Sequence, residues 1–191
     1  MAGEVKRGTE FATIDVVCVS VRPRGSENEL ILDTANQIQV TAATETQEKV
    51  ALIIKGVLIA QKPAETTITG NTITLTDNVF NPELVKILQG GTIKYDSQTP
   101  TKVVGYTPPV VGSTDKGEIF DLMTYSAIYD AAGIIQGYEK ITYPNCQGTP
   151  IAFGAEDGVF RASSYTINSA PSNGQAPYDM DIVNALPVVT S

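Results

Sequence analysis

The clearest alternation of apolar and polar positions lies in residues 65–77, where aliphatic residues alternate with threonines. Such alternation is typical of a β-strand with one buried face. Gly70 and Asn71 stand in the middle of it, and both tolerate the positive φ of a two-residue hairpin turn. We therefore predict a hairpin in which Ile68 lies opposite Ile73, with one face packed on a core.

A short helix is predicted directly afterwards, over residues 82–89. Asn81 is a suitable N-cap, Pro82 fits a first turn that needs no amide donor, and Glu83 favours the positive helix end. The apolar positions recur at three- and four-residue spacing, and a glycine pair follows them: Leu84, Val85, Ile87 and Leu88, then Gly90 and Gly91. A helix of about eight residues is unstable alone in water, so we expect it to lie across an open sheet face and close the core.

Two further segments carry apolar side chains on both faces of a predicted strand. In the first, residues 11–21, the two faces are Ile14, Val16, Cys18 and Val17, Val19, Val21. In the second, residues 48–61, they are Val50, Leu52, Ile54, Leu58 and Ala51, Ile53, Val57, Ile59. A buried helix would also explain the second run, but its β-branched residues and Gly56 favour a strand. Its second cover would come either from the short helix or from a neighbouring subunit, because obligate interfaces resemble a core cut in half.

The rest of the chain predicts further strands and connections. Residues 96–117 contain Pro100, Pro108 and Pro109, which exclude a regular sheet interior and indicate a long extended loop. A second long hairpin is expected around residues 130–133, with Phe120, Leu122 and Ile128 on one face and Ile119, Met123, Tyr125 and Tyr129 on the other. A turn at Glu156, Asp157 and Gly158 precedes a strand over residues 159–167. We expect one domain over residues 1–191, with an N-terminal arm at 1–10 and a C-terminal arm or edge strand at 168–191.

Composition narrows the possible environments of the chain. The sequence has 191 residues, 42% of them apolar, and lacks the eighteen uninterrupted apolar residues of a membrane span. The first eleven residues show no apolar run after their basic pair, so we expect no secretory signal and a protein kept in the cytoplasm. Residues 1–110 carry 10 basic and 12 acidic side chains, a net of −2, whereas residues 111–191 carry 3 and 9, a net of −6. This balance argues against a module that grips DNA, because such grip depends on Lys and Arg contacts to phosphate.

Few residues suggest chemistry. Histidine is absent, which removes the usual general base and the commonest metal ligand. The carboxylate pair Glu156 and Asp157 is an acid or metal candidate, but a solvated turn is the preferred interpretation. Asp179 and Asp181 would bind a cation weakly, yet a charged strand edge that discourages unwanted pairing is the commoner use. We therefore expect no catalytic residues, no metal site, no cofactor and no enzymatic activity.

Cysteines and tyrosines leave two alternatives open. Cys18 and Cys146 have no metal-ligand spacing; two buried free thiols are the preferred interpretation, and a disulfide is neither supported nor excluded. Tyr125, Tyr129, Tyr138 and Tyr143 cluster on the second hairpin and would suit a carbohydrate-binding surface. Aromatic residues are also good strand formers and interface residues, and tryptophan is missing.

The order of motifs over residues 65–188 resembles that of bacteriophage tail tube proteins, also called major tail proteins. The resemblance is carried by TITGNTITLTD running into NPELVKILQGG, the extended GYTPPVVGSTDKGE, the strand pair ending in ITYPNCQGTP, and the closing FRASSYTINSAPSNGQAPYDMDI. It implies a mainly β fold: an antiparallel β-sandwich or partial barrel with one short flanking helix. It assigns no individual functional residue.

The resemblance also implies a function: a structural subunit of stacked hexameric rings that form a hollow tube for DNA delivery into the host. The expected partner is the chain itself, with tape measure, sheath, baseplate or tail-tip and terminator proteins as neighbours, DNA only as passing cargo, and no membrane. The expected location is the virion tail or a phage-tail-like particle, assembled in the bacterial cytoplasm. The alternatives are a β-rich adhesin or carbohydrate-binding module, a capsid decoration protein, and a hydrolase with a histidine-free mechanism.

Overall fold

The computed structural model describes residues 12–152, 157–158 and 162–188. Within these residues the chain forms strands and one helix in the order β1 (Thr13–Pro23), β2 (Leu30–Leu32), β3 (Ala35–Gln47), β4 (Val50–Ile54), β5 (Val57–Lys62), β6 (Glu65–Asp77), α1 (Pro82–Gln89), β7 (Thr92–Tyr95), β8 (Val103–Thr107), β9 (Phe120–Tyr129), β10 (Ile135–Gly148), β11 (Ser163–Ser169) and β12 (Asp179–Val183).

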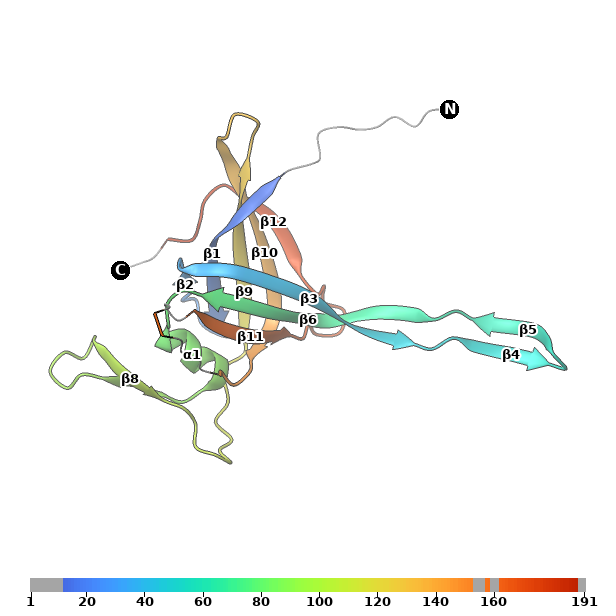
Figure 1. Cartoon of the computed structure of the whole chain (residues 1–191), viewed down its shortest axis with the longest axis horizontal. Helices are drawn as coiled ribbons and strands as arrows, with labels where there is room; N and C mark the ends of the chain where they lie inside the picture. The colour runs from blue at the N-terminus through green and yellow to red at the C-terminus, as the bar shows by residue number, and fades with distance from the viewer. Residues whose placement is uncertain (1–11, 153–156, 159–161, 189–191) are drawn as a thin grey trace.

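The body of the molecule is one curled antiparallel sheet. Its strands follow the order β2-β1-β9-β10-β11-β6-β3, and β12 pairs with β10 beside this path. The curl brings β3 and β6 across β1 and β9, so that β3 approaches β1 from the opposite end of the sheet without closing a barrel (Figure 1). The predicted fold class, a mainly β antiparallel partial barrel with one short flanking helix, is confirmed.

The main core lies inside the curl and is closed by α1. All four apolar positions predicted for the helix are buried in it, together with aliphatic and aromatic side chains from the curled strands: Val19, Val21, Leu32, Ile73, Leu75, Phe120, Leu122, Tyr165 and Ile167. Asn81 caps the helix, because its side-chain oxygen accepts from the backbone N–H groups of Glu83 (3.0 Å) and Leu84 (3.2 Å). Gly90 ends it at φ 82°, where its N–H donates to the Lys86 carbonyl. The helix prediction is confirmed in both its bounds and its role.

A second, smaller core covers the other face of the sheet. Cys18, Met123 and Tyr125 are buried there against Ile31 and against side chains near the C-terminus, Val183 and Leu186. Both faces of β1 are therefore covered from Cys18 onward, as the two-faced pattern predicts, whereas Ile14 near the start of the strand is 57% exposed. Val16 packs against the main core rather than beside Cys18, because the pairing of β1 with β9 is irregular between Ile14 and Cys18 and shifts the alternation.

The predicted turn at Gly70 and Asn71 is wrong. β6 runs straight through both residues, and Ile73 lies opposite Ile167 and Val40 rather than Ile68. Glycine is required at position 70 for another reason: a Cβ there would overlap the Ser169 carbonyl oxygen of β11. Residue 70 therefore marks a close backbone approach, the second common meaning of a glycine inside a strand.

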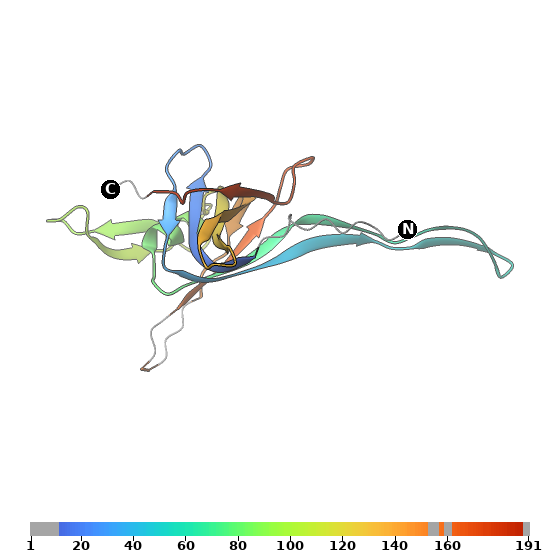
Figure 2. The same cartoon turned by 90° about the horizontal axis from the view of Figure 1, so that it is seen from above.

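The actual turn lies at Lys55 and Gly56. Both residues have positive φ, 48° and 79°, as a type I′ hairpin turn requires. The strand predicted over residues 48–61 is therefore split into β4 and β5, which pair with each other. The hairpin continues the paired strands β3 and β6 and extends away from the body as a long arm (Figures 1 and 2).

The remaining predicted segments are placed as follows. β9 and β10 form the second long hairpin, with Phe120 and Leu122 in the main core and Met123 and Tyr125 in the second core. Within residues 96–117, β8 pairs with β7 and the two prolines at 108 and 109 follow directly. Within residues 168–191, β12 lies on β10. Residues 1–11, Glu156 and the start of the strand predicted from Val159 lie outside the described residues; that strand is β11 from Ser163 onward.

Candidate assembly surface

The tip of the arm exposes a cluster of aliphatic side chains on both faces. We use "arm tip" for residues 49–62, which include β4, β5 and their turn. Val50, Ile53 and Val57 retain 60–65% of their accessible surface, and the neighbouring Leu52, Ile54, Leu58 and Ile59 retain 50–57%. The sequence leaves two covers open for this segment, the short helix or a neighbouring subunit, and the helix does not cover it, because the apolar face of α1 is buried in the main core.

The part of the arm between the body and its tip is mainly polar, with Ile68 as an exposed aliphatic side chain. Residues 44–47 of β3 pair with residues 65–68 of β6, and Thr46 and Thr66 share a hydrogen bond of 3.0 Å between their hydroxyls. Near the tip, Lys62 donates to the Gln47 side chain at 3.1 Å. Because the polar groups of this shaft can form hydrogen bonds with water, they do not require a protein partner. The exposed apolar surface of the arm is therefore concentrated at the arm tip rather than along the shaft.

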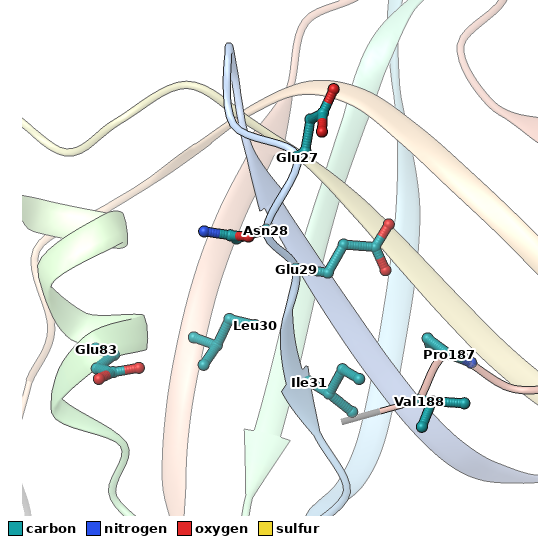
Figure 3. Close-up of a pocket in the computed structure, with 8 residues that line it drawn as sticks. All are labelled: Glu27, Asn28, Glu29, Leu30, Ile31, Glu83, Pro187 and Val188. Atoms are coloured by element: carbon teal, nitrogen blue, oxygen red, sulfur yellow. The ribbon is translucent and has the colours of Figure 1, made fainter. Parts of the chain in front are cut away.

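A cleft of about 600 Å³ lies beside β2, at the end of the body opposite the arm. Its walls come from the loop before β2, from the first turn of α1 and from the C-terminal segment, and it is lined by Glu27, Asn28, Glu29, Leu30, Ile31, Glu83, Pro187 and Val188. Figure 3 shows Asn28 and Leu30 turned towards the helix that carries Glu83, whereas Ile31 turns towards Pro187 and Val188. The cleft is therefore both acidic and apolar.

Three strand edges of the main sheet are open within the described residues. β2 pairs only with β1, β3 of the body pairs only with β6, and β12 pairs only with β10. On β12, Met180 and Ile182 are exposed. Unpaired edges of this kind invite pairing with another chain unless something covers them.

The two cysteines are free and buried, in agreement with the preferred interpretation. Burial raises the pKa of Cys18 from 9.0 to about 11 and the pKa of Cys146 from 9.0 to about 12. Raised values keep both thiols protonated at neutral pH, so neither is an activated nucleophile. Because folding raises these pKa values, the associated stability is complete below pH 9 and is lost as pH rises through the folded values.

The candidate tyrosines do not form one surface. Tyr125 is buried in the second core and Tyr143 in the main core, on opposite faces of the sheet. Burial raises the pKa of Tyr143 to about 12. Tyr129 and Tyr138 are more exposed, at the outer end of the β9–β10 hairpin. A flat aromatic platform for a sugar is not assembled from these four residues.

Three of the four carboxylate candidates are described by the structure, and all three are exposed. Asp157 lies in an exposed turn, while its predicted partner Glu156 is outside the described residues. Asp179 and Asp181 are exposed on β12, and Asp181 lies opposite Lys140 in the strand pairing. Among the residues that the structure describes, no group of three or more His, Cys, Asp or Glu side chains is placed to hold a metal ion. Across those residues, too, no helix has the length and apolar character needed to cross a membrane.

Comparisons with known proteins show a likeness to a solved structure. No family model matches this chain, and no curated protein matches it. Among solved structures, a chain of the anti-feeding prophage baseplate, determined by cryo-electron microscopy with six-fold symmetry, is similar to this chain with 9% identity and a TM-score of 0.35. The alignment covers 96% of this chain and 98% of that chain. A likeness with so low an identity and TM-score does not assign a function to this chain.

The residues of the arm tip are predictable from the sequence, whereas those of the cleft are not. The apolar positions of residues 48–61 were visible as a two-faced run, and only their exposure needed the structure. The cleft joins residues near 28, 83 and 187, which are far apart in sequence. No local pattern signals such a convergence.

Proposed function

We propose that this chain is a structural subunit, not an enzyme, that assembles with copies of itself into stacked hexameric rings forming a hollow tail tube for DNA. The observation that carries the proposal is the arm tip: seven aliphatic side chains at least half exposed, held away from the body on a polar shaft. A contiguous apolar surface of this kind marks a protein–protein contact in a stable protein. The resemblance of residues 65–188 to tail tube proteins supplies the type of assembly.

Two further features support an assembly built from sheets. The body is a curled sheet that does not close on itself, and its β2, β3 and β12 edges have no partner strand within the described residues. Pairing or packing of these edges between neighbours in a ring would remove the exposed edges, as closure does in a barrel.

The charge suits a tube through which DNA passes. The whole chain has a net charge of −8 at pH 7, and residues 111–191 account for −6 of it. An acidic wall repels phosphate, so DNA would move past it without adhering. Tape measure, baseplate or tail-tip, terminator and, in a contractile particle, sheath proteins are the neighbours that this function implies.

Negative-stain electron microscopy and sedimentation velocity of the purified full chain test the proposal. We expect rings with six-fold symmetry or hollow tubes, in equilibrium with smaller species. Monodisperse monomers across the accessible concentration range would contradict the proposal. A monomer that binds glycans would select the adhesin alternative, and a monomer that binds only to a capsid lattice would select the decoration protein.

A pair of matched variants tests the role of the arm tip within that assembly. Ile53→Asp places a charge in the aliphatic cluster, whereas Thr101→Asp places the same charge on an exposed position of the turn between β7 and β8, outside the arm and the open edges of the main sheet. We expect Ile53→Asp to abolish rings and tubes and Thr101→Asp to preserve them, with equal melting temperatures for the two unassembled proteins. Assembly that survives Ile53→Asp would remove the observation on which the proposal rests.

A further inference from the structure

The arm tip is basic as well as apolar. Residues 49–62 contain three lysines, Lys49, Lys55 and Lys62, and no acidic residue, in a chain whose net charge is −8. Lys55 occupies the turn itself, at the outermost point of the arm, and no ion pair holds it within the described residues. A docking surface for this hairpin should therefore offer carboxylates beside apolar side chains.

The cleft beside β2 has that composition. Leu30, Ile31 and Val188 give it apolar walls, and Val188 is 82% exposed. Of its three carboxylates, Glu29 pairs with Arg22 at 3.8 Å, whereas no ion pair within the described residues engages Glu27 or Glu83. Two unpaired carboxylates therefore face a site that also has apolar surface to bury.

The two surfaces lie at opposite ends of one molecule. The arm extends from one side of the body, while β2, the first turn of α1 and the C-terminal segment lie at the other side (Figures 1 and 2). The tip of a copy therefore cannot reach its own cleft. Contact between these surfaces joins different copies head to tail, and a head-to-tail contact generates a ring or an open helical array.

We propose that the arm tip of one copy binds in the acidic cleft of the next copy, with the Lys55 turn placed between Glu27 and Glu83. The inference rests on the proposed function, because it names the surface that receives the arm in the assembly. The aliphatic side chains of the tip bury against Leu30, Ile31 and Val188. The charge pairing fixes which end of the neighbour is bound, since complementary charges across an interface favour one register over others.

The size of the cleft is consistent with this occupant. Pockets of about 300–1,000 Å³ enclose drug-sized molecules, and the cleft, at about 600 Å³, falls in this range. That space suits the two-residue turn and the side chains that flank it. The wider shaft would remain outside, which agrees with its polar surface.

Charge reversal with rescue tests the pairing. Lys55→Glu and Glu27→Lys each place like charges together, so we expect each to raise the concentration needed for half-maximal assembly by about tenfold. Combining both substitutions in one chain restores opposite charges, and the double variant should return to within about threefold of the unaltered protein. A double variant that assembles no better than either single variant would overturn the inference.

Lys102→Glu is the matched control, because it makes the same charge change in the β7–β8 hairpin, outside the arm. It should leave the assembly concentration unchanged, and an effect equal to that of Lys55→Glu would assign the result to net charge and overturn the specific pairing. Melting temperatures of the unassembled variants exclude misfolding.

The same measurements distinguish the inference from the proposed function. Six-fold rings insensitive to all three substitutions would overturn this inference and leave the proposed function standing. Rescue by the double variant in particles that are not six-fold rings would support the contact between arm tip and cleft and contradict the proposed hexameric tube.

Cross-linking gives an independent readout. A protein carrying Lys55→Cys and a second carrying Glu27→Cys are mixed and treated with a short bismaleimide; the two native thiols are buried. We expect a covalent heterodimer from the mixture and little product from either protein alone. A homodimer of the Lys55→Cys protein in place of the heterodimer would show tip-to-tip contact and overturn the inference.

Discussion

The body and the arm tip are built from the same kinds of side chain and differ in what covers them. Ile73 and Leu75 of β6, in the body, are fully buried, whereas Ile53 and Val57, at the tip of the arm, are about 60% exposed. In both places aliphatic residues line paired antiparallel strands. In the body the cover comes from α1 and the curled sheet; at the tip, no other part of the described chain supplies it. A run of apolar residues therefore indicates that a surface is buried, but it does not indicate whether the same chain or another molecule covers it.

The energetic contrast is large. Full burial of a Val, Leu or Ile side chain is worth about 1.5–3 kcal/mol. The body already gains this energy on folding. The tip's side chains, at least half exposed, would each gain on the order of 1 kcal/mol when a partner covers them. This free energy of burial is gained only on association, so it contributes nothing to the stability of a lone subunit.

Leu75→Ala should give the largest loss on the covered side of the comparison. Leu75 is fully buried in the main core, so the substitution removes apolar contacts and leaves a cavity. We expect the free energy of unfolding to fall by about 3 kcal/mol, measured by urea denaturation of the unassembled protein. A loss below about 1 kcal/mol would mean that this core is less well packed than its burial indicates.

Gly70→Ala tests the point where the arm leaves the body. A methyl group at this position would overlap the Ser169 carbonyl oxygen of β11, and neither strand is free to move without breaking pairing. We expect a loss of about 2 kcal/mol in unfolding free energy. Gly56→Ala at the arm turn is the comparison: nothing lies within 4 Å of that position, so any loss there comes from the positive φ of Gly56 and not from steric overlap. A neutral Gly70→Ala would contradict the close approach of β6 and β11.

Asn81→Ala probes the helix that covers the main core. The substitution removes the side-chain oxygen that accepts from the N–H groups of Glu83 and Leu84. We expect the unfolding free energy to fall by about 1 kcal/mol, and Asn81→Ser to retain most of it. Equal losses for the alanine and serine variants would show that the cap is not what Asn81 contributes.

Ile53→Ala should have the smallest effect on the lone subunit. The side chain is 62% exposed, so its truncation removes little buried surface. We expect a change in unfolding free energy within about 0.5 kcal/mol for the unassembled protein. Assembly, followed by light scattering, should weaken in the same variant. A loss comparable to that of Leu75→Ala would show that the tip is covered by its own chain and would abolish the contrast between the two regions.

Local chemistry made the helix predictable and long-range contacts made the hairpin unpredictable. Asn81, Pro82 and the glycine pair act on the backbone within a few residues, so the sequence alone places α1 correctly. Gly70 is ambiguous because glycine serves both a turn and a close approach, and only the position of Ser169, about a hundred residues later, decides between them. The real turn was hidden because lysine is an uncommon residue at positive φ, although Gly56 beside it is a typical one.

The candidate assembly surface also has one part that local sequence indicates and one part that depends on long-range contacts. The aliphatic run of the tip is contiguous in sequence, and its two apolar faces indicate that it needs cover from the short helix or from a neighbouring subunit. The cleft depends on the meeting of three segments, from residues near 28, 83 and 187, and has no signature along the chain. Exposure and spatial convergence are properties of the folded chain, so these were the parts that sequence reasoning did not supply.

The continuity of β6 has a mechanical consequence. One strand of thirteen residues belongs both to the core, where it pairs with β11 and β3, and to the shaft, where it pairs with β3 alone. Its ladder hydrogen bonds run perpendicular to the strand, so tension applied along the arm loads many of them in shear together rather than one after another. We expect a filament linked through such arms to withstand stretching along them better than peeling across them, a difference that pulling a single subunit in the two directions would measure.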